Sequence, residues 1–403
     1  MKELRTGGAR SAPLMAARDD RAITAPSVIE VSRSGLLKNF RFFQRLTARS
    51  RSHVYPVVKA NAYGHGMKLV VRALEGVAGG FAVHSVEEAL QIAGETRKPV
   101  LIMGHIPDDT TIVENVLSRC DARFVVVEEE TVQTLAKAAA ALGRVVPIYV
   151  KLETGTNRLG LTMPGAARLA RQIRRNDALR LRGFSTHFAN IEDTTDHRYA
   201  ERQFEQFTTM AREIAGGDRY ELHSACSAAA LLFPKTHQSF IRLGISLYGY
   251  WPSRETFVSF KTSDAFTPKS IEPVLRWRTN PVQIKHVDEG DHIGYGLSYQ
   301  ARTRMKIAVL PIGYADGYDR RLSNTSYVLI RGKRAPVCGR VCMNLIMVDV
   351  THIKGVSLAD DAILLGKSGG ETLDADRIAS LLGSISYEVL ARLNPGIPRI
   401  LVR

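Results

Sequence analysis

Short apolar runs alternate with amphipathic stretches between about residues 54 and 250 of this 403-residue chain. Such runs, rich in β-branched residues and bounded by loop residues, are typical of strands buried on both faces of a parallel sheet, and the stretches between them have helical periodicity. Eight of these units predict an α/β fold with a TIM-type (β/α)8 barrel. The predicted strands are Val54 to Val58, Gly80 to Val83, Pro99 to Met103, Arg123 to Val127, Val146 to Val150, Leu181 to Thr186, Tyr220 to His223 and Phe240 to Leu247.

The pattern changes at about Ser270, where short alternating segments are separated by glycine and polar turns. Alternation with a period of two predicts a C-terminal, mainly β domain. We place a flexible tail at residues 1–25, the barrel at 26–265 and the β domain at 266–403, with a linker from Thr262 to Lys269. The strand-like segment Val28 to Val31 is a candidate for pairing with the β domain instead of entering the barrel.

Bulk composition indicates an ordinary globular protein, with 45% hydrophobic and 24% charged residues. No segment approaches the roughly 20 apolar residues of a membrane span, and the N-terminus lacks the apolar core of a secretory signal, so we expect a cytoplasmic protein without membrane contact. The four cysteines include no CxxC pair, which suits reduced thiols and no metal site. The net charge is +15, but the densest arginine group shares a helix with apolar residues, which favours a solvated helix face over a nucleic-acid interface. That group is Arg168, Arg171, Arg174 and Arg175.

The stretch VVKANAYGHG places Lys59 directly after an apolar run and before a glycine-spaced loop. A lysine at the edge of a core is partly desolvated, which lowers its pKa and favours the neutral amine that Schiff-base chemistry needs. Gly64 and Gly66 would let the backbone approach a ligand, and a helix from Met67 to Leu74 would offer its first amides to a phosphate. Lysine and phosphate site together suggest pyridoxal phosphate. The alternative is a solvated lysine at a strand end, followed by an ordinary turn.

Polar residues follow most of the predicted strands, and the carboxyl ends of barrel strands meet at one mouth. Each alone is weak evidence, because a histidine or arginine there is more often structural. Their shared position after the strands is the stronger signal. Ser85 and Glu88 also form the pattern of a capping box at the start of a helix. The residues after the strands are Lys59, His84, Lys151 with Glu153 and Arg158, His187, Ser224 to Ser227, and Arg242 with Gly244.

Nine ordered blocks between about Val28 and Arg403 resemble the alanine racemases. These are homodimeric pyridoxal-phosphate enzymes that have a (β/α)8 domain followed by a β domain. The resemblance implies interconversion of L-alanine and D-alanine, which supplies D-alanine for peptidoglycan. The blocks are VVKANAYGHG, LETGTNRLG, STHFAN, HSACSAAALLFP, RLGISLYG, IGYGLSY, LPIGYADG, GRVCMN, and the terminal ISYEV with IPRI.

The resemblance also implies how the cofactor is held. Lys59 would carry it as a Schiff base, and Arg242 would face the pyridine nitrogen. An arginine does not readily give up a proton, so it would weaken the cofactor as an electron sink and disfavour transamination. The phosphate would be held by Tyr63, Ser227, Gly244, Ile245 and Tyr387.

Racemisation needs two bases on opposite faces of the α-carbon. By the resemblance Lys59 is one, and Tyr295, supplied by the second subunit, is the other. The phenol of Tyr295 has an ordinary pKa near 10, which makes it a poor base at neutral pH. By the resemblance, His187 and Arg242 would lower this pKa and orient the phenol.

Further roles follow from the same resemblance. Arg158 and the backbone amide of Met343 would bind the substrate carboxylate, and Tyr314 would line the entrance. Lys151 matches a position that is often carbamylated in the family.

Four residues depart from the commonest family pattern: Glu153 replaces aspartate, Thr156 methionine, Cys226 asparagine and Asn344 aspartate. They leave the carboxylate-side geometry and the strictness for alanine open. A serine or broad-spectrum racemase would keep the same bases. A non-catalytic pyridoxal-phosphate-binding protein would lack the β domain, and the motifs of the basic-amino-acid decarboxylases are not found here.

Overall fold

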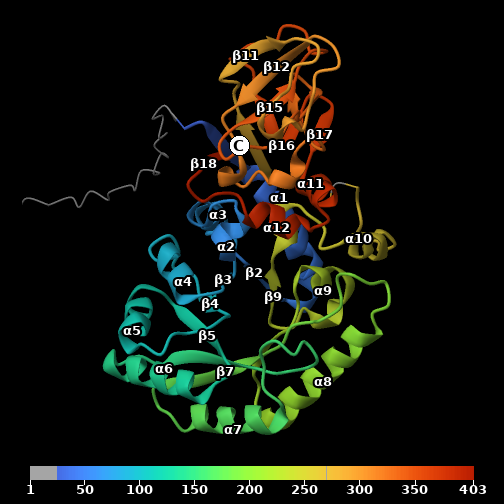
Figure 1. Ribbon diagram of the computed structural model, residues 1–403. Helices are drawn as coiled ribbons and strands as arrows, with labels where there is room; N and C mark the ends of the chain where they lie inside the picture. The colour runs from blue at the N-terminus through green and yellow to red at the C-terminus, as the bar shows by residue number, and fades with distance from the viewer. Residues whose placement is uncertain (1–24, 269) are drawn as a thin grey trace, which may run out of the picture.

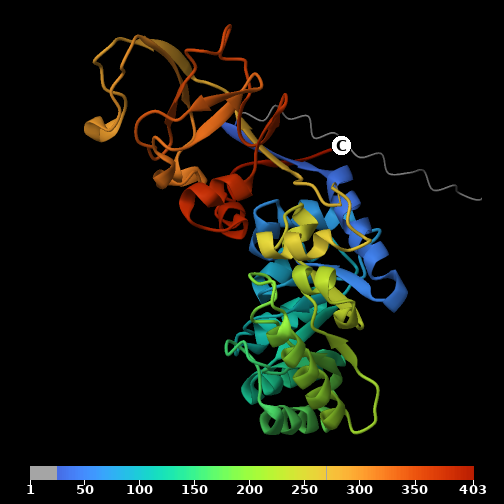
Figure 2. The same cartoon turned by 90° about the vertical axis from the view of Figure 1, so that its right-hand side faces the viewer.

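The computed structural model describes residues 25–268 and 270–403. It has two parts stacked end to end, a barrel of parallel strands with outer helices and a β domain beyond it (Figures 1 and 2). The predicted fold class is therefore confirmed. The predicted tail, apart from Ala25, lies outside the described residues, as does Lys269 of the predicted linker.

Eight parallel strands form the barrel wall, each at the position of one predicted apolar run. Strands β3 to β8 pair in sequence order, and β2 pairs with β9. Val57 bridges to Ala82 on one side of this pair, and the amide of Ser239 donates to the carbonyl of Leu222 on the other. Hydrogen bonds thus join the two sheets on both sides. The strands are β2 His53–Pro56, β3 Phe81–Val83, β4 Val100–Ile102, β5 Ala122–Val126, β6 Val146–Lys151, β7 Leu179–Ser185, β8 Glu221–His223 and β9 Phe240–Leu243.

Helices cover the outside of the strands (Figure 1). In α7 the apolar face, with Leu169 and Ile173, is buried while Arg168, Arg171 and Arg174 are exposed. The arginine group is therefore a solvated helix face. None of the described helices combines the length and apolarity of a membrane span. The helices are α1 Arg33–Leu46, α3 Met67–Leu74, α4 Val86–Ile92, α5 Thr110–Arg119, α6 Glu129–Ala141, α7 Met163–Arg174, α8 Arg198–Ala215, α9 Ser227–Leu232 and α10 Arg254–Lys261.

The first described strand, β1 (Ser27–Ser32), belongs to the sheet of the β domain. Ile29 lies opposite Trp277 of antiparallel β10 and opposite Arg399 of parallel β18. The other strands are β10 Leu275–Thr279, β11 Gln283–Val287, β12 Met305–Leu310, β13 Tyr327–Ile330, β14 Lys333–Pro336, β15 Ile346–Asp349, β16 Ala362–Ser368, β17 Glu371–Leu373 and β18 Arg399–Val402. Strands β11, β12 and β15 form a separate three-stranded sheet.

Charged pairs fasten β1 in place. Glu30 accepts from Arg276 at 2.8 Å and from Arg278 at 2.6 Å, and Arg276 also reaches Asp361 at 3.0 Å. The Glu30 side chain is largely shielded from water, so these bonds are screened less than exposed pairs. The start of the barrel chain is thereby fixed to the β domain.

Two helices, α11 (Ala375–Leu382) and α12 (Ser386–Ala391), close the β domain. Figure 1 shows α12 at the junction of the two parts, next to α2 (Lys59–Tyr63). A Cβ on Gly64 would lie 2.1 Å from the carbonyl oxygen of Leu390, so only glycine permits this contact. Helix α12 of the β domain therefore lies at the mouth of the barrel.

Candidate active site

A cavity of about 540 Å³ lies at the carboxyl ends of the barrel strands. Tyr387, on α12 of the β domain, lines it together with the residues that follow the strands. The cavity therefore gathers side chains that are far apart in the sequence. The predicted site residues found in its lining are Lys59, Tyr63, His84, Lys151, Arg158, His187, Cys226, Ser227, Arg242, Gly244, Ile245 and Tyr387.

Lys59 begins a five-residue helical turn, α2 (Lys59–Tyr63), that is left-handed. Ala60, Asn61, Ala62 and Tyr63 have φ of 51°, 52°, 55° and 51°. This conformation costs an L-residue about 1–2 kcal/mol, so the surrounding structure must hold it. The Lys59 amine is half-buried, and burial, followed by the charge of Arg158, lowers its pKa. A larger fraction of neutral amine results, as Schiff-base chemistry requires.

The start of α3, predicted as a phosphate site, does not line this cavity. The amide of Met67 already donates to Asn61 Oδ1 at 2.9 Å, and Gly64 approaches α12 rather than a ligand. Gly66 faces the side chain of Arg399. These glycines serve chain packing, which sequence spacing alone does not distinguish from ligand approach.

A better cradle for a phosphate lies where β9 ends. A Cβ on Gly244 would lie 2.9 Å from Tyr63 Oη and 3.7 Å from Ser227 Oγ, so the missing side chain leaves room between two hydroxyl groups. Ser227 Oγ accepts from the Gly244 amide at 3.0 Å. Hydroxyl groups around a small gap are donors that a phosphate needs, and the residues expected to hold the cofactor phosphate fit it.

Arg242 is buried and held almost entirely by backbone carbonyls. One terminal nitrogen contacts His223 Nδ1 at 2.6 Å and the His223 carbonyl at 2.7 Å, and the other donates to Thr186 and Ser224 carbonyls. Because arginine only donates, His223 must accept through Nδ1 and carry its proton on Nε2. The Arg242 Nε–H is left without a partner among the described residues. Burial lowers the Arg242 pKa to about 10.

Cationic groups crowd the cavity. Burial, then Arg242 and Arg158, lowers the pKa of Lys151 to about 8. Burial and the same two arginines hold the pKa of His187 well below its ordinary value, so it is neutral at physiological pH. A site with this excess of positive charge fits an anionic cofactor and a substrate carboxylate.

Glu192 is a cavity residue that sequence reasoning missed. Its Oε2 accepts from Tyr387 Oη at 3.0 Å, and its Oε1 lies 3.7 Å from Cys226 Sγ. Burial raises the pKa of Glu192, and it raises that of the Cys226 thiol to about 12. Glu192 lies five positions after His187 in the same loop. Considering every polar residue of the loop after each strand, and not only the first ones, would have identified it.

Two of the four departures organise the loop that carries Arg158. Glu153 Oε1 accepts from the amides of Gly155 at 2.6 Å and Thr156 at 2.7 Å, and Thr156 Oγ1 donates to the His187 carbonyl at 2.5 Å. Glu153 is therefore engaged within the loop, whereas Thr156 joins this loop to the one that follows β7. Cys226 instead meets Glu192, as described above, and Asn344 lines a second cavity.

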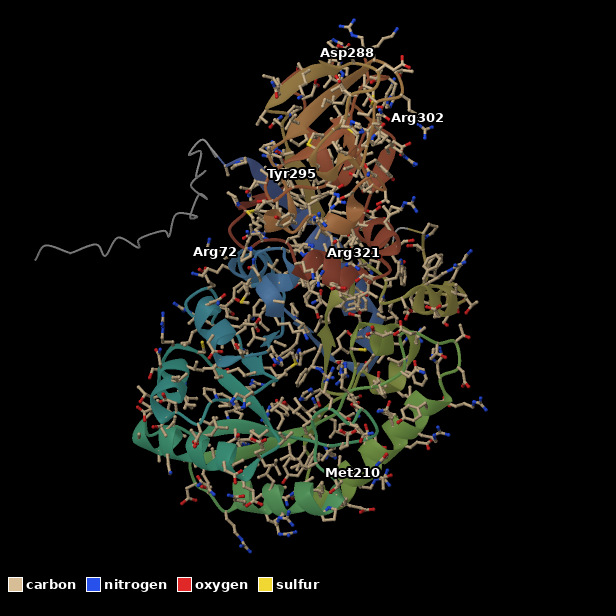
Figure 3. All side chains as sticks on the ribbon, viewed as in Figure 1. Arg72, Met210, Asp288, Tyr295, Arg302 and Arg321 are labelled. Carbon is tan, nitrogen blue, oxygen red and sulfur yellow. The ribbon has the colours of Figure 1, made fainter. Side chains whose placement is uncertain are left out.

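That second cavity, about 450 Å³, lies in the β domain and contains Tyr295, Tyr314 and Met343. None of the three lines the cavity of Lys59. Figure 3 shows Tyr295 on the β domain, far from Met210 of the barrel. The exposed fractions of Tyr295, Leu297 and Met343 are 70%, 69% and 56%, which is high for large apolar side chains. Within one chain, the two expected bases are thus apart.

Comparison with known proteins covers both domains. The sequence models of the alanine racemase N-terminal and C-terminal domains match residues 31–252 and 274–401. The chain belongs to the alanine racemase family. The alanine racemase of Leptospira interrogans is 35% identical over 94% of this chain and 96% of its own length. That of Methanococcus maripaludis is 34% identical over 94% and 99%.

Solved structures of alanine racemases agree with this assignment. The Clostridium difficile enzyme has a TM-score of 0.86 at 30% identity, over 94% of this chain and 96% of that one. The Bacillus anthracis enzyme, solved with bound L-Ala-P, has a TM-score of 0.81 at 30% identity, over 94% and 95%. Membership of a two-domain alanine racemase family sets aside the decarboxylase reading.

Proposed function

We propose that this protein is a pyridoxal-phosphate-dependent isomerase that interconverts L-alanine and D-alanine in the cytoplasm, as a source of D-alanine for peptidoglycan. The observation that carries the proposal is the shared cavity of Lys59, Arg242 and the Gly244 cradle in a chain of the alanine racemase family. The family spans also support a domain boundary near residue 265, with residues 28–31 counted in the β domain because β1 pairs there.

The residues of the cavity fit the cofactor as follows. Lys59 would bind its carbonyl carbon, and Tyr63, Ser227, Gly244, Ile245 and Tyr387 would hold its phosphate. The unpartnered Nε–H of Arg242 would face the pyridine nitrogen. Bound pyridoxal phosphate supplies the electron-withdrawing ring that acidifies the α-carbon of an attached amino acid.

Two bases would then move the proton. Lys59 Nζ would hold it on one face of the α-carbon, and Tyr295 Oη of the partner subunit would hold it on the other. Neutral His187, with Arg242 behind it, would orient the phenol. Arg158 would bind the substrate carboxylate with the backbone N–H of Met343, which has no partner within the described chain, and Tyr314 would line the entrance.

A homodimer is part of this proposal, because one chain separates Lys59 from Tyr295. Tyr295 and Met343 line the second cavity, and together with Leu297 they expose large apolar side chains that a partner subunit would cover. A two-fold arrangement that seats this surface on the barrel mouth of a second copy would complete two equal sites.

The proposal is tested by circular dichroism of L-alanine incubated with purified protein and added pyridoxal phosphate. Loss of the L-alanine signal, with L-serine, L-lysine and L-arginine unchanged, is the expected result. Comparable loss with the other amino acids would replace it with a broad-spectrum racemase. Cofactor binding without any loss would indicate a non-catalytic binding protein.

Lys151 is expected to be carbamylated. A pKa of about 8 leaves part of the amine neutral at physiological pH, and this neutral form adds to CO₂, releasing one proton. The product is an anion that would offset Arg158 and Arg242. With ¹³CO₂, a protein-bound carbamate signal in NMR should grow at fixed dissolved CO₂ as pH rises through about 8. Lys151→Met should remove the signal, whereas Lys68→Met, at an exposed position of α3, should keep it. Equal signals from both variants would contradict the assignment.

A further inference from the structure

The left-handed turn after Lys59 needs an external restraint. Ala60, Asn61, Ala62 and Tyr63 all have φ between 51° and 55°, and none is glycine. An L-residue reaches this region readily only as a single residue, so four in succession relax to other conformations unless contacts oppose it. The position and direction of the Lys59 side chain depend on this turn, because the two share a backbone.

The downstream end of the turn is secured by several groups. Asn61 Oδ1 accepts from the Met67 amide at 2.9 Å, and Arg399 Nε donates to the Gly64 carbonyl at 3.1 Å. His65 Nδ1 contacts the Tyr63 carbonyl at 2.8 Å. The Gly64 amide also donates to the Ala60 carbonyl at 3.0 Å. None of these contacts engages the Ala60 amide, which is left to another partner.

That partner is Glu88 of α4. Its Oε1 accepts from the Ala60 amide at 2.7 Å, and its Oε2 accepts from the His84 amide at 2.7 Å. Within the described chain it is the only side chain that binds Ala60. The sequence predicts Glu88 as the second half of a capping box with Ser85, and Ser85 does accept from the Glu88 amide. The carboxylate, however, reaches out of its own helix to join the loops that follow β2 and β3.

A carboxylate is required for this bridge. Its two oxygens both accept, whereas glutamine offers one acceptor and places a donor against the second amide. The site at the first turn of α4 also favours negative charge. In addition, the Glu88 charge opposes the burial that lowers the Lys59 pKa.

We propose that Glu88 is a positioning residue, whose carboxylate fastens the left-handed turn to the loop after β3 and so directs Lys59 towards the cofactor. The inference rests on the proposed function, since it assigns Lys59 to the cofactor. It adds a residue that does not touch the substrate and acts only through the backbone of Ala60.

The test compares Glu88→Gln with Glu87→Gln, a neighbouring carboxylate on the exposed side of the same helical turn. Titration of cofactor-free protein with pyridoxal phosphate should show binding weakened about 10- to 100-fold for Glu88→Gln, as expected for a lost charge-assisted hydrogen bond. Its kcat for alanine should fall while KM stays within about twofold, since the substrate contacts are untouched. Amide hydrogen exchange at Ala60 and His84 should speed up. Glu87→Gln should match the wild type in each.

Two results would overturn the inference. One is wild-type cofactor binding and wild-type Ala60 exchange in Glu88→Gln. The other is a lower melting temperature with unchanged cofactor affinity, which would show a structural role alone. Wild-type protein that binds the cofactor but does not racemise alanine would defeat the proposed function separately, because binding and exchange would still report on the turn.

Discussion

Replacing Lys59 with alanine is expected to lower alanine racemisation by at least about 10⁴-fold, since the proposed covalent link and one base are lost together. Borohydride reduction followed by peptide mass spectrometry should find the cofactor on Lys59 in the wild type and on no lysine in the variant. Lys68→Ala is a matched control, because Lys68 is exposed on the next helix. Cofactor attached to Lys151 in the wild type would contradict the assignment of Lys59.

The Lys59→Ala protein should fold at least as well as the wild type without cofactor. Among the residues that the structure describes, the Lys59 amine has no hydrogen-bond partner to lose. Burial lowers its pKa below the value of 10.5 for a free lysine, so its charged form costs folding free energy at pH 7. That cost would disappear as pH rises towards 10.5. Thermal unfolding at pH 7 therefore serves as the folding control for the activity loss.

Replacing Tyr295 with phenylalanine is expected to slow racemisation in both directions by on the order of 10³-fold, because each full turnover needs a proton acceptor and a donor on opposite faces. Tyr295 is 70% exposed in the single chain, so the loss of one hydroxyl should leave the fold intact. In D₂O, Lys59 should still exchange the α-proton of one enantiomer without inverting it. Wild-type rates in both directions would refute the two-base proposal. Equal exchange of both enantiomers would show that a single base serves both faces of the α-carbon.

Mixing the two variants tests whether the bases come from different subunits. If sites are shared, a heterodimer of Lys59→Ala and Tyr295→Phe has one doubly damaged site and one intact site. Random reassociation of equal amounts should then restore roughly a quarter of wild-type activity. If each chain supplied both bases to its own site, no mixture would be active.

The fold was readable from sequence because its main elements carry local signals. Each barrel strand is a short buried run, so Val146 to Val150, for example, predicts β6 (Val146–Lys151) to within one residue. Helices such as α3 (Met67–Leu74) are predicted by apolar residues spaced to form one face. For β1, pairing with the β domain was a candidate interpretation, but its two partner strands could not be predicted. Its alternation gives a strand, but pairing with β10 and β18 depends on segments hundreds of residues away.

The candidate site was partly readable for the same reason. Strand ends converge in any barrel, so Lys59, Lys151 and Arg242 could be placed at one mouth. The left-handed turn could not be foreseen, since Lys-Ala-Asn-Ala-Tyr contains no glycine and tertiary contacts impose the conformation. Nor could the reach of Glu88 out of its capping role, because a capping box and a bridge between loops share one sequence pattern.

The sheet of the β domain contains strands from both extremes of the described chain. Ser32 Oγ donates to the carbonyl of Arg403, 371 residues away, beside the parallel pair of β1 and β18. In topological terms, the entire barrel is an insertion between two adjacent strands of another domain. During synthesis the edge of β1 that pairs with β18 therefore stays uncovered until β18 leaves the ribosome. The barrel can fold before that point. Loss of the last few residues would leave that edge uncovered and free to pair with other chains.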